Sequence, residues 1–439
     1  MVVKLFSVIS RVSVLLFAGV LSVQATPAIK SWNTQNGARV FYAHAPEIPM
    51  LDVRFVFDAG AARDDKLPGL AKLTNALLTE GAGDWDADQI AERVEGIGAS
   101  LNVESLRDMA VVSLRTLTEP QASEIALQTM ATVLARPLFS ESAIQRNLEQ
   151  LKIVLRQEQQ SPADIADKAF YRSLYRQHPY AQPVNGTEAS IAAINREAIL
   201  NFYQQYYVAA NAVIAIVGDV DEQRARAIAE QLSAGLERGK AAKALPAVAA
   251  SEAQRQVIEY PSQQAHLSIG LPVLSRQDAD YFSLYVGNHI LGGSGLVSKI
   301  SNEIREKRGL AYSAYSYFSP MHQAGPFKIG LQTKNSQVDE AEKVVLQTLA
   351  DYIAKGPSEE ELEKSKQNIT GGFPLRTASN KDIVSYLAMI GFYGLPLDYL
   401  DVFVDKVNAV TVDSIRDAFK RRVDMNALST VIVGQVNPS

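Results

Sequence analysis

Any chemistry that this chain performs must do without a thiol, because its 439 residues include no cysteine. The lack of cysteine excludes disulfides, thiolate metal sites, iron–sulfur clusters, a cysteine nucleophile and a lipidated cysteine. There are five histidines, and any metal site would have to combine some of them with carboxylates: His44, His178, His266, His289 and His322.

Two short motifs invite a functional interpretation and do not support one. His44 and Glu47 have the spacing of a metal-binding helix, but Pro46 breaks a helix and the residue after Glu47 is Ile48. The glycine cluster at 292–295 resembles a phosphate-binding turn, yet no Lys-Ser/Thr pair follows it, and the chain has no G-x-S-x-G elbow. We expect a loop at the first motif and a tight turn at the second.

The composition is that of a globular protein with two or more domains, at 47% hydrophobic and 21% charged residues. Lys+Arg number 43 and Asp+Glu 48, so the net charge of −5 gives no general attraction to nucleic acid.

An internal repeat predicts the architecture. IVGDV at 216–220 recurs as IVGQV at 432–436, an offset of 432 − 216 = 216 residues. SLRT at 113–116 and GLQT at 330–333 are offset by 330 − 113 = 217 residues, and a predicted helix follows each. Two matches at nearly one offset indicate a tandem duplication. We expect homologous halves at 26–234 and 257–439, joined by an Ala- and Lys-rich linker at 235–256.

Within each half the pattern is α+β, with strands and helices that do not alternate as in a Rossmann fold or barrel. A predicted helix at 68–80 has Pro68 in its first turn and Gly81 just after its end. The other expected helices are 121–135, 140–160, 164–175 and 195–207, and the expected strands are 53–57, 109–117, 212–217, 265–271, 312–318 and 326–333.

The first 25 residues have the pattern of a secretory signal. Lys4 and Arg11 precede an apolar run at 12–23, and the small residue Ala25 ends a typical cleavage site. A membrane anchor is the alternative, but the run falls short of the roughly 20 residues that a span needs. Cleavage would leave 43 − 2 = 41 basic against 48 acidic residues, a net charge of −7. We expect a periplasmic protein, because large exported chains without cysteine are typical of bacteria.

The stretch from Val53 to Gly83, VRFVFDAGAARDDKLPGLAKLTNALLTEGAG, resembles the pitrilysin/insulinase family of zinc peptidases, which includes the mitochondrial processing peptidases. In that family an inverted motif, H-x-x-E-H, places two zinc ligands on one helix face and a glutamate that activates water. The corresponding residues here are Lys72, Asn75 and Ala76, none of which can do this work. The family's third ligand would fall near Glu149. The resemblance implies the family's scaffold with no metal site in this chain.

A second stretch, IREKRGLAYS at 304–313, resembles the family's LRExxGLAYS segment. We expect an amphipathic helix from Ser294 to Arg308, capped by Ser294, with Leu296, Ile300 and Ile304 on one face and Gly309 after its end. The resemblance implies that Arg305 and Tyr312 reach into the zinc site of another half or subunit.

Such a pair has a clear chemical use. A guanidinium can hold a peptide carbonyl or carboxylate through two donors, and a phenol can stabilise the oxyanion formed at the scissile carbonyl. The structural alternative is that Arg305 makes a surface ion pair and Tyr312 packs in a strand. The resemblance extends further: HPY at 178–180 precedes GT at 186–187, and residues 206–219 contain a family-like YxxxNxxxxxVGD segment.

These features predict the bacterial, half-size branch of the family and a subunit without its own zinc. A paralogous partner with H-x-x-E-H would hold the zinc, and this chain would bind peptide or unfolded protein and complete the partner's site through Arg305 and Tyr312. A homodimer is possible without the partner. The alternative is a non-enzymatic binding or assembly protein that kept the fold. An active peptidase on its own would need ligands that the sequence lacks.

Overall fold

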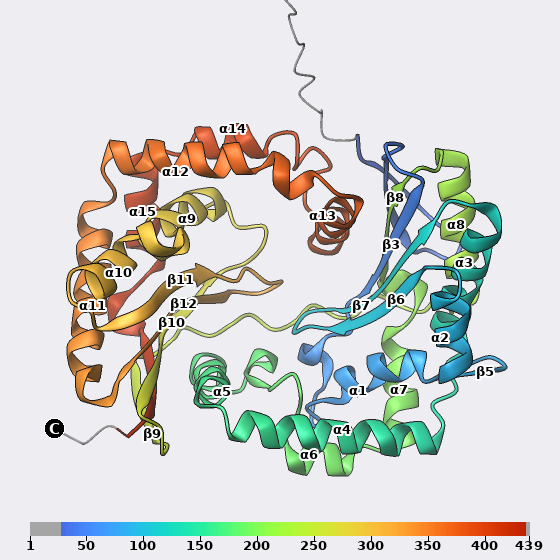
Figure 1. The fold of residues 1–439 in the computed structure, drawn as a ribbon, viewed down its shortest axis with the longest axis horizontal. Coiled ribbons are helices and arrows are strands. Elements are labelled where there is room, and N and C mark those ends of the chain that lie inside the picture. The colour runs from blue at the N-terminus through green and yellow to red at the C-terminus, as the bar shows by residue number, and fades with distance from the viewer. Residues whose placement is uncertain (1–27, 436–439) are drawn as a thin grey trace, which may run out of the picture.

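The computed structural model describes residues 28–435, and within them two β-sheets face each other across the molecule (Figure 1). The predicted signal peptide and its cleavage site lie outside this range. The first sheet has six strands, in the order β1 (Lys30–Asn33), β2 (Arg39–His44), β8 (Ala212–Gly218), β3 (Met50–Phe57), β7 (Ala110–Leu117) and β6 (Ser100–Ser105). The second has five, in the order β9 (Gln254–Glu259), β13 (Ser429–Gly434), β10 (Gln264–Leu274), β12 (Gly325–Lys334) and β11 (Ala311–Phe318).

The two sheets have the same topology. β2 is parallel to β8, β9 is parallel to β13, and the other pairings in both sheets are antiparallel. From β2 to β6 the strand order therefore matches the order from β9 to β11, and β1 is an addition to the first half. β8 and β13 contain the repeated IVG segments and occupy the same place in their sheets. The prediction of two homologous α+β halves is confirmed.

Helices cover the outer face of each sheet. In the first half they are α1 (Leu70–Ala76), α2 (Ala87–Glu95), α3 (Pro120–Ala135), α4 (Glu141–Gln159), α6 (Glu188–Ala193), α7 (Arg196–Tyr206) and α8 (Glu222–Ser233), beside a short β4–β5 ribbon (Gly81–Ala82 and Trp85–Asp86). In the second they are α9 (Tyr281–Asn288), α10 (Lys299–Ser301), α11 (Val338–Lys355), α12 (Glu359–Gly372), α14 (Phe403–Asn408) and α15 (Val412–Arg422). Across residues 28–435, no helix has the length and apolar character of a membrane span.

One helix from each half packs against the inner face of the other half's sheet. α5 (Pro162–Tyr175) packs on β10 and β13, and α13 (Asn380–Tyr393) packs on β8 and β3 (Figure 1). Both faces of β8 are thus buried, and its seven residues are all in the core. Because successive side chains of a strand point to opposite faces, Ile214 packs with the first half's helices and Val213 packs with the second half.

A buried carboxylate joins the halves where two hairpin tips meet. Asp108, in the β6–β7 turn, accepts hydrogen bonds from the Tyr180 hydroxyl at 2.6 Å, the His322 backbone N–H at 2.8 Å and the Tyr393 hydroxyl at 3.1 Å. His322 lies in the β11–β12 turn of the second half. Burial and the Asp108 carboxylate both raise the pKa of Tyr180, which keeps its phenol protonated as a donor.

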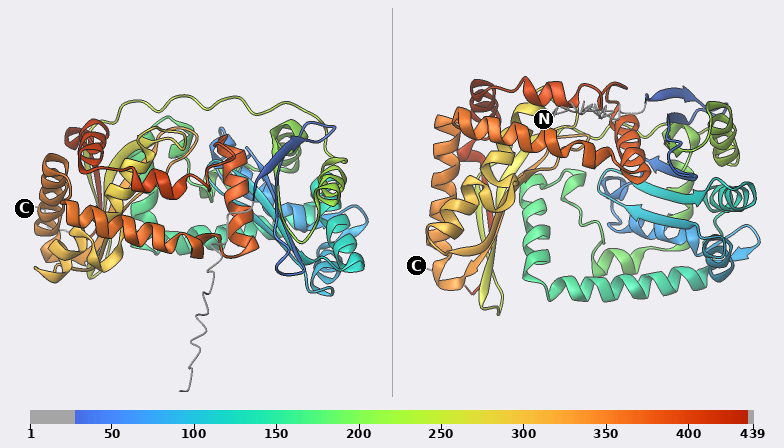
Figure 2. Two further views of the ribbon diagram at one scale, coloured as in Figure 1. Left: turned by 90° about the horizontal axis from the view of Figure 1, so that it is seen from above. Right: turned by 45° about the horizontal axis from the view of Figure 1, so that its top comes forward.

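The segment predicted to link the halves runs as coil from 237 to 253 along one side of the molecule (Figure 2). It is held to both halves, since the Lys243 carbonyl accepts from Arg63 and the Leu245 carbonyl accepts from Gln323. The last three residues of the predicted segment, 254–256, instead begin strand β9, because they pair in parallel register with β13.

Candidate functional site

The helix that corresponds to the family's metal helix is held at its N-terminus by a buried carboxylate. Asp64 accepts from the backbone N–H groups of Gly69 and Ala71, both at 2.7 Å, which satisfies donors that a helix start leaves free. Burial raises the pKa of Asp64 to about 7. The observed helix, α1, spans Leu70–Ala76 and continues as a 3-10 turn to Thr79, close to the predicted 68–80. The sequence analysis missed Asp64, although a carboxylate just before a Pro-Gly helix start was a usable signal.

At the positions of the zinc motif, α1 carries side chains with structural contacts. Asn75 is 1% exposed; its amide nitrogen donates to the carbonyls of Glu104 at 2.8 Å and Val111 at 3.3 Å. Its amide oxygen accepts from the Tyr207 hydroxyl at 3.0 Å. Asn75 therefore ties α1 to strands β6 and β7 and to the end of α7. Lys72 and Ala76 are half-buried on the same helix.

The donor set at these positions does not fit a zinc ion. A lysine ammonium repels a cation, the Asn75 amide is committed to three protein partners, and an alanine has no lone pair. Glu149, near the expected third ligand, is an exposed residue of α4 that pairs with Lys152 at 2.6 Å. Between residues 28 and 435 no three His, Asp or Glu side chains form a group able to hold a metal.

Replacing Asn75 with alanine is expected to destabilise the protein by about 1–3 kcal/mol, because the buried Tyr207 hydroxyl and the buried Val111 carbonyl lose this partner. Chemical denaturation of the mature chain measures this loss. Lys72→Ala on the same helix is the matched control and is expected to change the unfolding free energy by less than about 0.5 kcal/mol. Equal effects of the two substitutions would contradict a structural role for Asn75.

The predicted helix at 294–308 is wrong as a continuous element. The chain forms a 3-10 turn at Gly295–Val297, one α-helical turn at Lys299–Ser301 and a π-helix at Asn302–Glu306. Gly295 is in the left-handed region (φ +65°) and Ser298 is extended, so the helix begins only after Ser298, which caps it. Leu296 is consequently 60% exposed, whereas Ile300 and Ile304 are fully buried.

The end of this segment is as predicted and orients the arginine–tyrosine pair. Gly309 has φ +61° and its N–H bonds to the carbonyl of Arg305 at 2.9 Å, a left-handed helix end that releases the chain into β11. The Arg305 guanidinium carbon lies 4.9 Å from the centroid of the Tyr312 ring, within cation–π range. Arg305 also has Glu306 at 3.6 Å as an ion partner.

Tyr312 presents its phenol to solvent. It is 82% exposed, and no residue from 28 to 435 is a hydrogen-bond partner of its hydroxyl. A β-bulge against β12 lies between Ala311 and Ala314, and it turns both Tyr312 and Ser313 outward. The structural alternative, in which Tyr312 packs in a strand, is therefore not what the structure shows.

The structure brings Arg305 and Tyr312 together and keeps them apart from Lys72, Asn75 and Ala76. Tyr312 is at the start of β11, whereas the hairpin tip that contacts Asp108 of the first half follows the end of this strand. The two ends are separated by six residues, or about 20 Å of extended chain. The pair is thus about one strand length from that contact, and Tyr312 is accessible from solvent.

Two family models match consecutive parts of the chain. Residues 39–188 match the insulinase (peptidase family M16) model, and residues 193–369 match the peptidase M16 inactive domain model. A solved structure titled peptidase M16 inactive domain, from Pseudomonas fluorescens, is 37% identical, with a TM-score of 0.91 over 94% of this chain and 98% of that one. A protease from Helicobacter pylori, 19% identical with a TM-score of 0.86 over 93% of this chain and 100% of that one, has the same fold.

Curated relatives carry names of both kinds, peptidase and non-peptidase. The uncharacterized zinc protease YmxG of Bacillus subtilis is 24% identical over 88% of this chain and 94% of its own length. The non-peptidase homolog YmxG of Helicobacter pylori is 26% identical over 95% of this chain and 97% of its own.

Proposed function

This chain belongs to the M16 (insulinase) peptidase family, and on that premise we propose that it is the zinc-free subunit of a periplasmic heteromeric zinc peptidase. Its similarity to an M16 inactive domain and to a non-peptidase homolog fits a family member without catalytic activity of its own. In the proposed complex, a paralogous partner carries H-x-x-E-H and the zinc, and this chain binds peptide and completes the site.

The observation that carries the proposal is the geometry of Arg305 and Tyr312. A tyrosine that is 82% exposed, has a free hydroxyl and is oriented by a neighbouring guanidinium does little for the stability of its own chain. Its bulged strand and its place away from the first half leave it open to a second chain. Both side chains are donors, which are the groups needed around a carbonyl that becomes an oxyanion.

The division of work follows from that chemistry. The Arg305 fork can grip a carbonyl or carboxylate of the bound peptide, and the Tyr312 phenol can donate to the oxyanion as it forms. Neither group attacks the peptide bond, so this chain alone is expected to be inactive. Activity requires these donors and the partner's site to meet at one carbonyl.

Reconstitution is the direct test. The mature chain is co-expressed with an exported paralogue that has an intact H-x-x-E-H motif, and the complex is examined by size-exclusion chromatography and with a quenched fluorescent peptide library. We expect a heterodimer whose peptidase activity exceeds that of either chain alone. Failure of every such paralogue from the same genome to bind this chain would refute the proposal.

Purified mature protein is expected to carry no stoichiometric zinc, since Lys72, Asn75 and Ala76 replace the metal-binding motif. Elemental analysis after dialysis against a weak chelator measures the content, with an H-x-x-E-H paralogue as the positive control. One tightly held zinc per chain, lost on substitution of any of the five histidines, would overturn this prediction.

Export is expected to leave Thr26 as the mature N-terminus, since a basic start, an apolar run and Ala25 precede it. N-terminal sequencing of the protein recovered from the periplasmic fraction tests both the cleavage and the location. Retention of Met1 in that fraction would contradict the predicted cleavage.

A non-enzymatic role in periplasmic binding or assembly is the second candidate. The commitment of Asn75 to structural hydrogen bonds and the similarity to a non-peptidase homolog favour it. The two candidates differ in one accessible observation: the peptidase role requires a neighbouring gene for an exported H-x-x-E-H paralogue, and the assembly role does not.

A further inference from the structure

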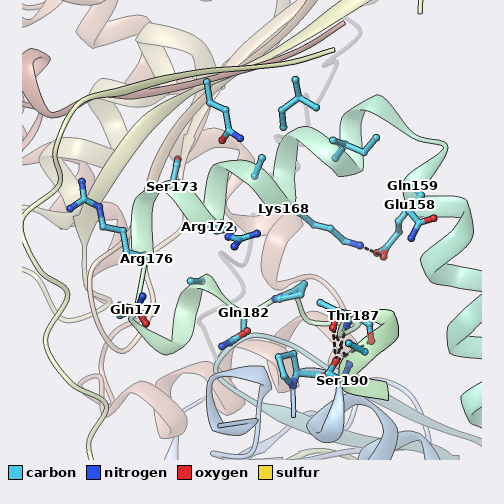
Figure 3. Close-up of a pocket in the computed structure, with 18 of the residues that line it drawn as sticks. Glu158, Gln159, Lys168, Arg172, Ser173, Arg176, Gln177, Gln182, Thr187 and Ser190 are labelled. Atoms are coloured by element: carbon cyan, nitrogen blue, oxygen red, sulfur yellow. Dashed lines mark hydrogen bonds and ion pairs between the residues drawn. The ribbon is translucent and has the colours of Figure 1, made fainter. Parts of the chain in front are cut away.

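Three basic residues, two on α5 and one at its C-terminal end, line a large cavity. Lys168 and Arg172 are four residues apart and lie on one face of the helix, and Arg176, with φ +48°, is the residue that ends it. The cavity has a volume of about 1110 Å³ and lies between this face, the segment from Ala181 to Ala193 and strand β9 of the other half. Figure 3 shows Lys168 extending from α5 to Glu158, and Gln182, Thr187 and Ser190 on the side of the cavity across from Arg172. We call this cavity the α5 groove.

The α5 groove has more positive than negative charge. Lys66, on the wall opposite α5, adds a fourth cation, and Glu158 is the one carboxylate among the residues that line the groove. Glu158 is committed to Lys168 at 2.5 Å and to Asn185 at 2.7 Å. No carboxylate from residue 28 to 435 lies within ion-pairing distance of Arg172 or Lys66. In a chain of net charge −5, these are free cations in a concave site.

The third of these basic residues is weakly held. Arg176 pairs with Glu252 at 2.7 Å, but 42% of the arginine side chain and 75% of the glutamate side chain are exposed. Pairs as exposed as this one contribute about 0–1 kcal/mol, so a ligand carboxylate can replace Glu252 at little cost.

One side of the groove is the edge of a sheet. β9 is the terminal strand of the second sheet, and five of its six residues are exposed. Gln254, Gln256 and Ile258, at alternate positions, line the groove. α5 packs mainly on β10 and β13, and of the β9 residues that line the groove only Ile258 joins the hydrophobic cluster that includes α5. An exposed edge strand next to a long groove is suited to an extended polypeptide.

The spacing of the basic residues matches such an occupant. Residues four apart on a helix are separated by about 6 Å along its axis, and residues two apart in an extended chain by about 6.6 Å. We propose that the α5 groove binds an extended acidic segment of a polypeptide, with carboxylates at alternate residues lying against Arg172 and Arg176. The site requires no partner subunit, so it can be tested independently of the peptidase role.

Fluorescence anisotropy with the mature chain and a labelled octapeptide of alternating Glu and Ser tests the proposal. We expect this peptide to bind, with an affinity that falls as salt rises, and peptides alternating Gln and Ser or Lys and Ser to bind at least 10-fold more weakly. Arg172→Glu is expected to weaken binding of the acidic peptide by about 10-fold or more without lowering the melting temperature, because Arg172 has no ion partner to lose.

Arg238→Glu makes the same charge change at an exposed coil position outside the groove and is expected to alter the affinity less than twofold. Equal binding of the Glu and Gln peptides would overturn the proposal, as would an unchanged affinity in Arg172→Glu. Displacement of the peptide by inorganic phosphate as effectively as by unlabelled peptide of equal total charge would also overturn it, since a small anion would then suffice.

Discussion

Replacing Tyr312 with phenylalanine is expected to lower the turnover of the reconstituted pair by roughly 100- to 1000-fold, the usual effect of losing one oxyanion donor. The substitution removes only the hydroxyl, which has no hydrogen-bond partner among residues 28–435. The ring stays beside the Arg305 guanidinium, so the melting temperature and complex formation should not change. Steady-state kinetics, thermal unfolding and size-exclusion chromatography on one preparation give all three quantities.

Tyr315→Phe is the matched control for Tyr312→Phe. Tyr315 lies on the same strand, is 42% exposed and stacks on Tyr317 at a centroid distance of 6.0 Å. Loss of its hydroxyl is expected to leave turnover within about twofold of the wild type, which is the behaviour of a surface change without a catalytic role. Unchanged turnover in Tyr312→Phe would refute the oxyanion role and remove the main support for the peptidase function.

Replacing Arg305 with alanine is expected to raise KM by about 10- to 100-fold, with a smaller change in kcat. Hydrogen bonds to a charged group contribute about 1.5–3 kcal/mol, and a guanidinium that grips the peptide acts in the ground state and the transition state alike. The side chain is 29% exposed and its only ion partner between residues 28 and 435 is the adjacent Glu306, so the fold should tolerate its removal. Kinetics over a range of peptide concentrations separate the two parameters.

Arg305→Lys distinguishes a fork-shaped contact from simple charge. Lysine keeps the charge and loses the two parallel donors, so it should recover only part of the affinity. If the role of Arg305 were purely structural, the expected result would differ. Arg305→Ala would then lower the melting temperature, and the activity would be proportional to the folded fraction. Equal kcat/KM for wild type, alanine and lysine would contradict any contact with substrate.

Strands and turns with strong local signals could be predicted from the sequence. The alternation of apolar residues at 109–117 appears as β7, and Gly309 ends its helix in the left-handed conformation, as only glycine does without strain. The prediction of a continuous helix at 294–308 was wrong, because only part of the apolar spacing corresponds to buried helical positions. Ile300 and Ile304 are buried. Gly295 and Ser298 have a non-helical backbone, so the helix begins only at Lys299 and does not include Leu296.

Lys168, Arg172 and Arg176 were visible in the sequence as a basic row at helical spacing. A row of this kind usually marks a solvated helix face, and the sequence could not show that a second half would add a strand beside it. The groove exists because α5 crosses to the other half's sheet, where it packs mainly on β10 and β13 beside the edge strand β9.

The sequence by itself predicted the duplicated α+β halves and gave the residue types at Lys72, Asn75, Ala76, Arg305 and Tyr312, because these depend on residue identity and on local spacing. Only the tertiary structure decided that α5 and α13 each pack on the sheet of the other half. The same holds for the hydrogen bonds by which Asn75 joins α1 to β6, β7 and α7, and for the exposure of Tyr312 on a bulge. These features arise from contacts between residues far apart in the chain. Their energies depend on which surfaces meet, and no local pattern in the sequence specifies that.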